Sequence, residues 1–261
     1  MNINKKIFRD SFELDVPFDT KVRLVKGGFT GKKAYIFAAG PSINDVDFDK
    51  LSKELKSNLV ICIKQSYTRV EEFCDVLLMN FCNFNDYEWS KIDCPVIWTS
   101  FENNHSDIIH EKGIKCDALL PVVENERNNF AGLSKSTAGK KAWDNFNRLE
   151  ENKAIWGPGL MYELAIPLAI NSGVEKICLV GWDIGKKTGK DDAFLNEHFY
   201  ENTNVSMKTK ITDIEVDIVS KSTIHLKDWL QEQGIELTVT SDKSLVHCGV
   251  KRENEWLKKR V

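Results

Sequence analysis

Short runs of apolar residues recur along the chain. Most of them lack the alternation of polar and apolar positions that marks a half-exposed strand. A continuous apolar run of this length is typical of a strand that is buried on both faces of a sheet. The pattern predicts strands at 35–39, 58–64, 75–80, 94–100, 117–123, 175–183 and 235–241.

Amphipathic segments lie between these runs, and their apolar positions recur with the spacing of a helix. The segments that predict helices are 45–57, 104–113, 138–151, 159–172 and 222–233. Strands that alternate with helices indicate βαβ units, so we expect an α/β fold with a Rossmann-like, mostly parallel sheet and helices on both faces. Ligands of such sheets bind beyond the carboxyl ends of the strands.

The chain divides into an N-terminal extension, 1–31, and one Rossmann-like domain, 32–261, on which the extension is expected to pack. Within the domain, the segments 124–137 and 184–221 are polar and weakly periodic. The second is long for a connector. Long loops often serve as lids or binding loops, so 184–221 is predicted to form a lid-like region.

Composition excludes several classes of protein. Of the 261 residues, 42% are hydrophobic and 29% are charged, which is enough for a full core. The net charge of −3 argues against nucleic acid as a partner, because nucleic-acid-binding domains carry an excess of lysine and arginine. No apolar run approaches the ~18 residues of a membrane-spanning helix, and the first residues lack the apolar region of a signal peptide. We therefore expect a cytoplasmic protein whose seven scattered cysteines are reduced core residues.

The C-terminal tail, 253–261, is aromatic and basic. Such a composition is compatible with peripheral contact at the inner face of a membrane, although a segment of nine residues favours a solvated helix end. We therefore expect any contact of the protein with a membrane to be peripheral. The oligomeric state stays open, a homo-oligomer included.

The first predicted strand stops at Gly40-Pro41-Ser42. Glycine lets the backbone turn or approach a ligand closely, and proline fixes φ and gives up a hydrogen-bond donor. Ser42 or Asn44 is expected to cap a helix that starts near Asp45. A strand, a tight glycine turn and a helix start together place a nucleotide at the end of a parallel sheet, although an ordinary connecting turn has the same layout.

Polar residues and glycines also gather where the other strands stop. A glycine loop that opens a helix presents N–H groups that can hold a phosphate or a carboxylate. These strand-end and loop residues are Lys64, Gln65, Asn80, Gly157, Gly159 and Asp183. Each is weak evidence alone, but their place at one edge of one sheet favours a binding site.

Four stretches carry a resemblance to a known family. "IFAAGPSINDVDFDKL", "ICIKQSY", "VLLMNFCNF" and "GVEKICLVGWDI" resemble, in that order, the landmarks of bacterial sialyltransferases that use CMP-sialic acid. "GPGLMYELAIPLAINSGVEKICLVGWD" resembles the domain shared by flagellin-modifying motility accessory factors and archaeal hydroxymethylpterin diphosphokinases. The resemblance covers roughly residues 33 to 240. Both groups act on phosphate-activated compounds at the end of a Rossmann-like sheet.

The resemblance implies roles for individual residues. Gly40 and Ser42 match a turn that touches the phosphate or ribose of the donor, and Asn80 matches a strand-end Asn that binds the nucleotide or sugar. Asp183 matches an Asp after the last core strand, where a helix or turn cap is the alternative role. Taken together, the residue pattern and the resemblance give the complete set expected to bind substrate, in which Lys187 and Tyr200 would hold the leaving phosphate: Gly40, Pro41, Ser42, Lys64, Gln65, Asn80, Gly157, Gly159, Lys187 and Tyr200.

The chain also departs from the sialyltransferase pattern. Ala39 and Lys64 stand where that family has Asn, and its phosphate-holding tyrosines and catalytic His have no clean match. The donor can therefore differ from CMP-sialic acid.

An inverting transfer needs a base for the acceptor hydroxyl and groups that hold the leaving phosphate. His198, in the predicted lid, is the first candidate for the base, followed by His225 and then Asp183. His105 and His110 are expected to face solvent, and His247 to be structural.

The function predicted from these observations is a metal-independent glycosyltransferase without a cofactor. It would move a sialic-acid-like or other ulosonic sugar from a CMP-linked donor to a surface glycan or a lipid-linked precursor. The first alternative is a pterin diphosphokinase that uses ATP and Mg²⁺, which would need Asp45, Asp47 and Asp183 to converge. The second is an inactive nucleotide- or glycan-binding module. The stretch "DVDFD" is expected to begin a helix and not to bind a metal.

Overall fold

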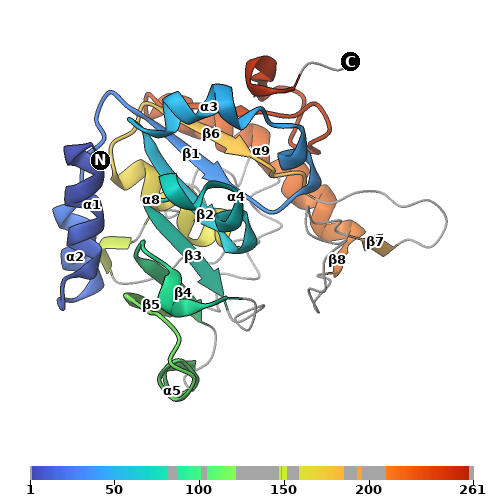
Figure 1. The fold of residues 1–261 in the computed structure, drawn as a ribbon. Coiled ribbons are helices and arrows are strands. Elements are labelled where there is room, and N and C mark those ends of the chain that lie inside the picture. The colour runs from blue at the N-terminus through green and yellow to red at the C-terminus, as the bar shows by residue number, and fades with distance from the viewer. Residues whose placement is uncertain are drawn as a thin grey trace.

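The computed structural model describes residues 2–80, 87–100, 105–121, 147, 149–151, 159–184, 193–195 and 210–258. Its centre is one sheet of eight parallel strands in the order β10-β9-β6-β1-β2-β3-β4-β5 (Figure 1). The strands are β1 (Lys33–Phe37), β2 (Leu59–Ile63), β3 (Val76–Asn80), β4 (Val96–Ser100), β5 (Ala118–Pro121), β6 (Lys176–Val180), β9 (Glu236–Val239) and β10 (Lys251–Arg252). The predicted α/β fold with a Rossmann-like sheet is confirmed.

Helices cover both faces of the sheet, as expected. The side chains of one face pack against α1 (Ile3–Glu13), α2 (Phe18–Leu24), α8 (Ile166–Asn171) and α9 (Asp213–Glu232). Those of the other face pack against α3 (Phe48–Leu55), α4 (Tyr67–Val70) and α5 (His105–Glu111). All five residues of β2 and of β4 are buried, which explains why these strands show no alternation of polar and apolar positions.

Helix α9 begins nine residues before its expected start, at Asp213 and not at 222. The segment 213–221 is rich in Ile and Val, whose stiff side chains lower the intrinsic helix propensity. The sequence pattern therefore did not predict a helix in this segment. Val216 and Val219 are buried against the sheet, so tertiary packing stabilises this part of the helix. The same predicted loop also contains the antiparallel strands β7 (Ala193–Leu195) and β8 (Lys210–Thr212). That the remainder acts as a lid stays a prediction.

The C-terminal tail forms a short helical turn, Asn254–Trp256, that is attached to the domain through its backbone. Leu257 forms an isolated β-bridge with Val46, and the N–H of Asp47 donates to the carbonyl of Trp256 at 2.7 Å. These contacts bring the tail, up to residue 258, alongside the connection between β1 and α3. In the part of the chain that the structure describes, no helix has the length and apolar character needed to cross a membrane.

The cysteines follow the expectation in part. Cys62, Cys74, Cys94 and Cys178 are buried and reduced, whereas Cys248 is exposed. Burial raises the pKa of the Cys178 thiol to about 12, so this core thiol stays protonated and unreactive at neutral pH.

Candidate functional site

The sheet has a topological switch point between β1 and β6. From β1 the chain builds β2, β3, β4 and β5 on one side, and it then returns to place β6 and β9 on the other. The chain therefore continues from β1 towards one edge of the sheet and from β6 towards the other edge. Open α/β sheets bind ligands in the crevice that such a divergence creates.

The backbones that follow β1 and β6 touch at this point. The N–H of Gly40 donates to the carbonyl of Gly181 at 2.8 Å. A Cβ at Gly40 would lie 2.4 Å from that carbonyl oxygen and 2.5 Å from Oδ2 of Asp183. The φ of Gly40 is −66°, which any residue adopts, so lack of space and not conformation requires glycine here. The close approach at Gly40 is to the protein's own backbone, and its expected contact with a nucleotide stays a prediction.

Asp183 lies in this contact, with 7% of its surface exposed. Its Oδ2 accepts the N–H of Ser42 at 2.8 Å. Burial raises the pKa of the Asp183 carboxyl above its ordinary value, the hydrogen bonding from Ser42 partly opposes the rise, and nearby Asp45 adds to it.

Two polar atoms at the switch point have no hydrogen-bond partner in the described part of the chain. They are Oδ1 of Asp183 and Oγ of Ser42, and Ser42 is 2% exposed. Nearly all buried polar atoms in proteins are hydrogen-bonded, so a pair left unsatisfied at a ligand-binding edge marks a place where a ligand can complete the bonding. Oδ1 of Asp183 can accept a hydrogen bond from a hydroxyl or amino group, and the Ser42 hydroxyl can both donate and accept one.

The acidic stretch after the turn begins a helix, as predicted, but its cap is Asp47 and neither Ser42 nor Asn44. Asp47 is the N-cap of α3 and accepts the N–H of Lys50 at 3.3 Å. Asp45 pairs with Lys243 at 2.5 Å. Within the described ranges, no three His, Cys, Asp or Glu side chains are placed to hold a metal ion.

Strained backbone flanks the switch point. Lys64, directly after β2, has a φ of +52°, and Ile184, directly after Asp183, has a φ of +64°. Such conformations cost about 1–3 kcal/mol each for residues other than glycine, and they gather at functional sites. Ser66 stabilises the turn at Lys64, because its Oγ accepts the N–H of Ile63 at 3.0 Å and lies 2.8 Å from the carbonyl of Phe37 in β1.

A second polar group lies at the ends of β3 and β4. Asn80 and Thr99 are register partners, so their side chains share one face of the sheet. Thr99 Oγ1 donates to Oε2 of Glu163 at 3.2 Å, and Glu163 is 2% exposed. Glu163 lies on the π-helical turn η8 (Met161–Ala165), a helix type that is frequent at functional sites. Glu163 is not among the residues predicted from the sequence, although it is the single charge in the apolar stretch "GLMYELAIPLAI".

His105 is not solvent-facing, contrary to expectation. It is 9% exposed, and its Nδ1 is hydrogen-bonded to Oγ of Ser100, the last residue of β4. A polar helix was expected to expose both of its histidines, but the start of α5 lies against the end of β4, and this contact buries His105. His110, on the same helix, is exposed as predicted.

The structure brings some of the predicted site residues together and not others. Gly40, Pro41, Ser42 and Asp183 meet at the switch point, while Lys64 and Gln65 follow β2, and Asn80 ends β3, along the same edge. Gly159, with a φ of +79°, precedes η8, and His225 is half-buried in the middle of α9, about 18 Å from the start of the helix at ~1.5 Å per residue. Gly157, Lys187, His198 and Tyr200 lie outside the described residues.

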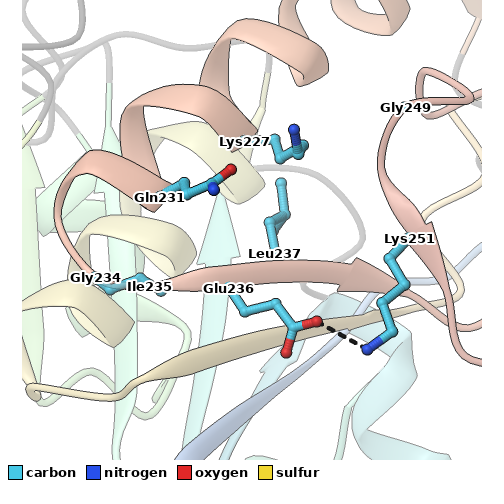
Figure 2. Close-up of a pocket in the computed structure, with 8 residues that line it drawn as sticks. All are labelled: Lys227, Gln231, Gly234, Ile235, Glu236, Leu237, Gly249 and Lys251. Atoms are coloured by element: carbon cyan, nitrogen blue, oxygen red, sulfur yellow. Dashed lines mark hydrogen bonds and ion pairs between the residues drawn. The ribbon is translucent and has the colours of Figure 1, made fainter.

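A separate hollow of roughly 450 Å³ lies at the other end of the sheet. It is formed by the C-terminal end of α9, the start of β9 and the strand β10, and Lys251 pairs there with Glu236 at 2.9 Å (Figure 2). Because ligands of parallel sheets bind at the carboxyl ends of the strands, this hollow is not the candidate site.

Comparison with solved structures identifies a similar fold. The MAf glycosyltransferase from Magnetospirillum magneticum AMB-1 matches with a TM-score of 0.53 and 12% identity, over 98% of this chain and 39% of that one. The sialyltransferase CST-II in complex with trisaccharide acceptor and CMP matches with a TM-score of 0.45 and 16% identity, over 88% of this chain and 89% of that one. The sialyltransferase CstII from Campylobacter jejuni in complex with a substrate analogue, cytidine-5'-monophosphate, matches with a TM-score of 0.42 and 16% identity, over 89% of each chain.

The sequence matches no family model, and no curated protein matches it. This chain spans 39% of the length of the MAf glycosyltransferase. At 12% identity, the likeness to that structure concerns the fold.

Proposed function

We propose that the protein is a glycosyltransferase that takes a sialic-acid-like or other ulosonic sugar from a CMP-linked donor. The acceptor would be a surface glycan or its lipid-linked precursor, and the transfer would invert the anomeric carbon without a metal ion. The observation that carries this proposal is the unsatisfied pair at the switch point, Asp183 Oδ1 and Ser42 Oγ. A fold neighbour described as a glycosyltransferase agrees with this activity.

Asp183 and Ser42 suit the nucleoside end of the donor. The carboxylate can accept hydrogen bonds from ribose hydroxyls or from the amino group of cytosine, and the Ser42 hydroxyl can donate to a ribose or phosphate oxygen. A buried hydrogen bond to a charged group contributes about 1.5–3 kcal/mol, so this pair alone would make a large difference to affinity.

The remaining strand ends suit the rest of the donor. Lys64 supplies positive charge for a phosphate, and Asn80 supplies an amide for the phosphate or sugar. β1 and β4 are three strand spacings apart, which is ~14 Å at ~4.8 Å per spacing. A nucleotide sugar extended along the edge would therefore reach from the switch point towards β4.

Thermal-shift measurements with CMP, CDP, UDP and ATP, each with and without Mg²⁺, test the proposal. We expect stabilisation by CMP without metal, because a ligand present at about 100 times its Kd stabilises the folded state by about 2.7 kcal/mol. Asn80→Ala should weaken CMP binding by about 0.5–1.5 kcal/mol and leave the fold intact. ATP stabilisation that requires Mg²⁺ would favour a diphosphokinase instead, and the absence of any nucleotide response would reject the transferase.

A further inference from the structure

The loop that joins β9 to β10, residues 241–250, holds the turn that carries Asp183. Ser244, which is 5% exposed, donates its hydroxyl to the carbonyl of Trp182 at 2.5 Å. The next residue, Leu245, donates its N–H to the carbonyl of Asp183 at 3.0 Å. Two consecutive residues of the β9–β10 loop thus fix two consecutive carbonyls of the turn that follows β6.

That turn needs support from outside itself. Ile184, directly after Asp183, is β-branched and has a φ of +64°, a conformation that such residues rarely adopt. Strained backbone of this kind persists only where the surrounding structure over-determines it. The two hydrogen bonds from the β9–β10 loop and the burial of the Ile184 side chain supply this constraint. The position of the Asp183 carboxylate therefore depends on the loop.

The β9–β10 loop is itself shaped by Arg252, a half-buried residue of β10. The loop contains neither helix nor strand, so its carbonyls lack the regular partners of secondary structure. The guanidinium of Arg252 donates to four of them, those of Ser244, Val246, His247 and Val250, at 3.4, 2.6, 3.0 and 2.6 Å. Because the N–H groups of a guanidinium form a rigid fork, one side chain sets the path of this whole segment.

Helix α9 also supports the loop. The N–H of His247 donates to Oγ1 of Thr223 at 2.9 Å, and the hydroxyl of Ser220 donates to the carbonyl of Leu245. Both helix residues lie on α9, which packs on the sheet. Arg252 and α9 therefore hold the β9–β10 loop together, and the loop holds the turn.

We propose that Arg252 is a positioning residue of the donor site: it shapes the β9–β10 loop, and the loop holds the turn so that the Asp183 carboxylate meets the nucleoside of the donor. This inference rests on the proposed glycosyltransferase function, in which Asp183 binds the donor. Arg252 needs no contact with the donor, because it acts through the loop. Its role depends on the shape of the guanidinium and not on its charge alone.

A purely structural role for Arg252 makes different predictions. Lysine at position 252 keeps the charge, but its single ammonium cannot replace a fork that reaches four carbonyls. If Arg252 only stabilises the fold, Arg252→Lys lowers the unfolding free energy and leaves the CMP affinity of the folded protein unchanged. If Arg252 positions the turn, the folded variant binds CMP more weakly.

The first measurement is isothermal titration with CMP, on the full chain and at a temperature where circular dichroism shows each variant to be folded. Ser244→Ala removes one hydrogen bond to the turn and should weaken CMP binding by about 2–10-fold. Arg252→Lys should weaken it by at least as much. Lys251→Gln is the matched control, because Lys251 is the neighbouring residue of β10, is exposed and pairs with Glu236 away from the site. It should bind CMP as the parent does.

The second measurement follows the ionisation of Asp183 without any nucleotide. Carbon-13 NMR of the side-chain carboxyls gives its titration, and the signal that is missing in Asp183→Asn identifies it. Burial is the largest cause that raises the pKa of Asp183, and Asp45 and Lys243 are the charged groups that act on it in the described part of the chain. A loosened turn admits water, so the pKa of Asp183 should fall towards its ordinary value in Arg252→Lys and Ser244→Ala. It should stay at the parental value in Lys251→Gln.

Both changes are expected in each of the two variants. A folded Arg252→Lys or Ser244→Ala that keeps either the parental CMP affinity or the parental titration of Asp183 would overturn this inference and leave the glycosyltransferase proposal standing. If Arg252→Lys does not fold, Ser244→Ala decides alone, because it leaves the guanidinium in place. Failure of the parent to bind CMP would reject both proposals.

Discussion

At the scale of single residues, Gly40 and Asp183 depend on each other. Oδ2 of Asp183 lies 2.5 Å from where a Cβ of residue 40 would be, and the same oxygen accepts the N–H of Ser42. The turn after β1 and the turn after β6 are therefore one structure, and a change in either turn reaches the other.

Gly40→Ala should disrupt this structure through contact alone. The added Cβ meets a backbone oxygen and a buried carboxylate, and overpacking of this kind costs about 1–3 kcal/mol. We expect a loss of that size in urea denaturation, together with loss of CMP binding. Gly113→Ala is the control, because Gly113 has open space around it and a φ of +60°. It should cost about 1–2 kcal/mol through backbone strain and leave CMP binding unchanged. Parental CMP affinity in folded Gly40→Ala would contradict the site.

Asp183→Asn should stabilise the fold and weaken binding. A carboxyl whose pKa is raised by folding favours its neutral form, so it contributes stability below its ordinary pKa and loses that contribution as the pH rises through the raised pKa. At pH 7 the charged, buried carboxylate is therefore unfavourable. An amide removes the charge and can still accept the N–H of Ser42.

Urea denaturation at several pH values tests this prediction. The unfolding free energy of Asp183→Asn should exceed that of the parent at pH 7, and the difference should shrink as the pH falls towards 4. CMP affinity should fall, because the amide presents a donor where the carboxylate presents an acceptor. Asp217→Asn, at an exposed position on α9, should change neither quantity. A destabilised Asp183→Asn that binds CMP normally would show that the carboxylate is purely structural.

At the scale of elements, helix α1 is attached to the sheet by a buried ion pair. Lys5 Nζ lies 2.7 Å from Oδ2 of Asp75, and their side chains are 6% and 2% exposed. Asp75 immediately precedes β3 and also accepts the N–H of Val60 at 2.8 Å. Burial raises the pKa of Asp75 to about 6, although Lys5 favours its charged form. The charged form of the Asp75 carboxyl is therefore stabilised by its ion pair with Lys5.

Lys5→Met should destabilise the protein by about 3–5 kcal/mol, because it leaves a buried carboxylate without its partner. The double variant Lys5→Met with Asp75→Asn should recover much of that loss, and the coupling energy from the cycle should exceed ~1 kcal/mol in urea denaturation. Lys6→Met, which breaks the exposed pair with Asp10, is the matched control and should cost less than ~0.5 kcal/mol. Additive losses in the cycle would show that the ion pair does not hold α1.

At the scale of the whole molecule, the N-terminal helices are part of the core. Phe8, Phe12 and Phe29 are fully buried in the cluster under the sheet. Lys21 Nζ donates to the carbonyl of Phe12 at 2.8 Å and to that of Asp117, next to β5, at 2.6 Å. Residues 1–31 thus pack on the domain, as the sequence predicts, and their separateness from residues 32–261 stays a prediction.

A chain that comprises residues 32–261 should therefore fail to fold independently. Removal of residues 1–31 exposes the apolar surfaces against which three aromatic rings pack, and it removes the Lys5 ammonium that pairs with Asp75. Each loss of this kind costs several kcal/mol, whereas the total stability of a domain is about 5–15 kcal/mol. Near-UV circular dichroism and thermal unfolding of the two chains provide the test. Cooperative unfolding of 32–261 near the parental Tm would show that 1–31 is a true extension.

The sequence by itself determined the class of fold and the positions of the main elements. Strands buried on both faces must be apolar throughout, so runs such as 58–64 and 94–100 are recognisable without any knowledge of their neighbours. Gly40 and Asp183 could be placed at strand ends for the same reason, because a glycine or an acid ends such a run.

Only the tertiary structure decided which strand ends are adjacent. Periodicity reports the environment of a residue but not its partner, so nothing in the sequence placed β6 beside β1 or joined Asp183 to Ser42, 141 residues apart. The same limit hid the start of α9, whose β-branched residues become helical through burial, and the burial of His105, which follows from the packing of a polar helix against β4. Contacts between distant segments set these features, because their free energy comes from burial that local sequence does not encode.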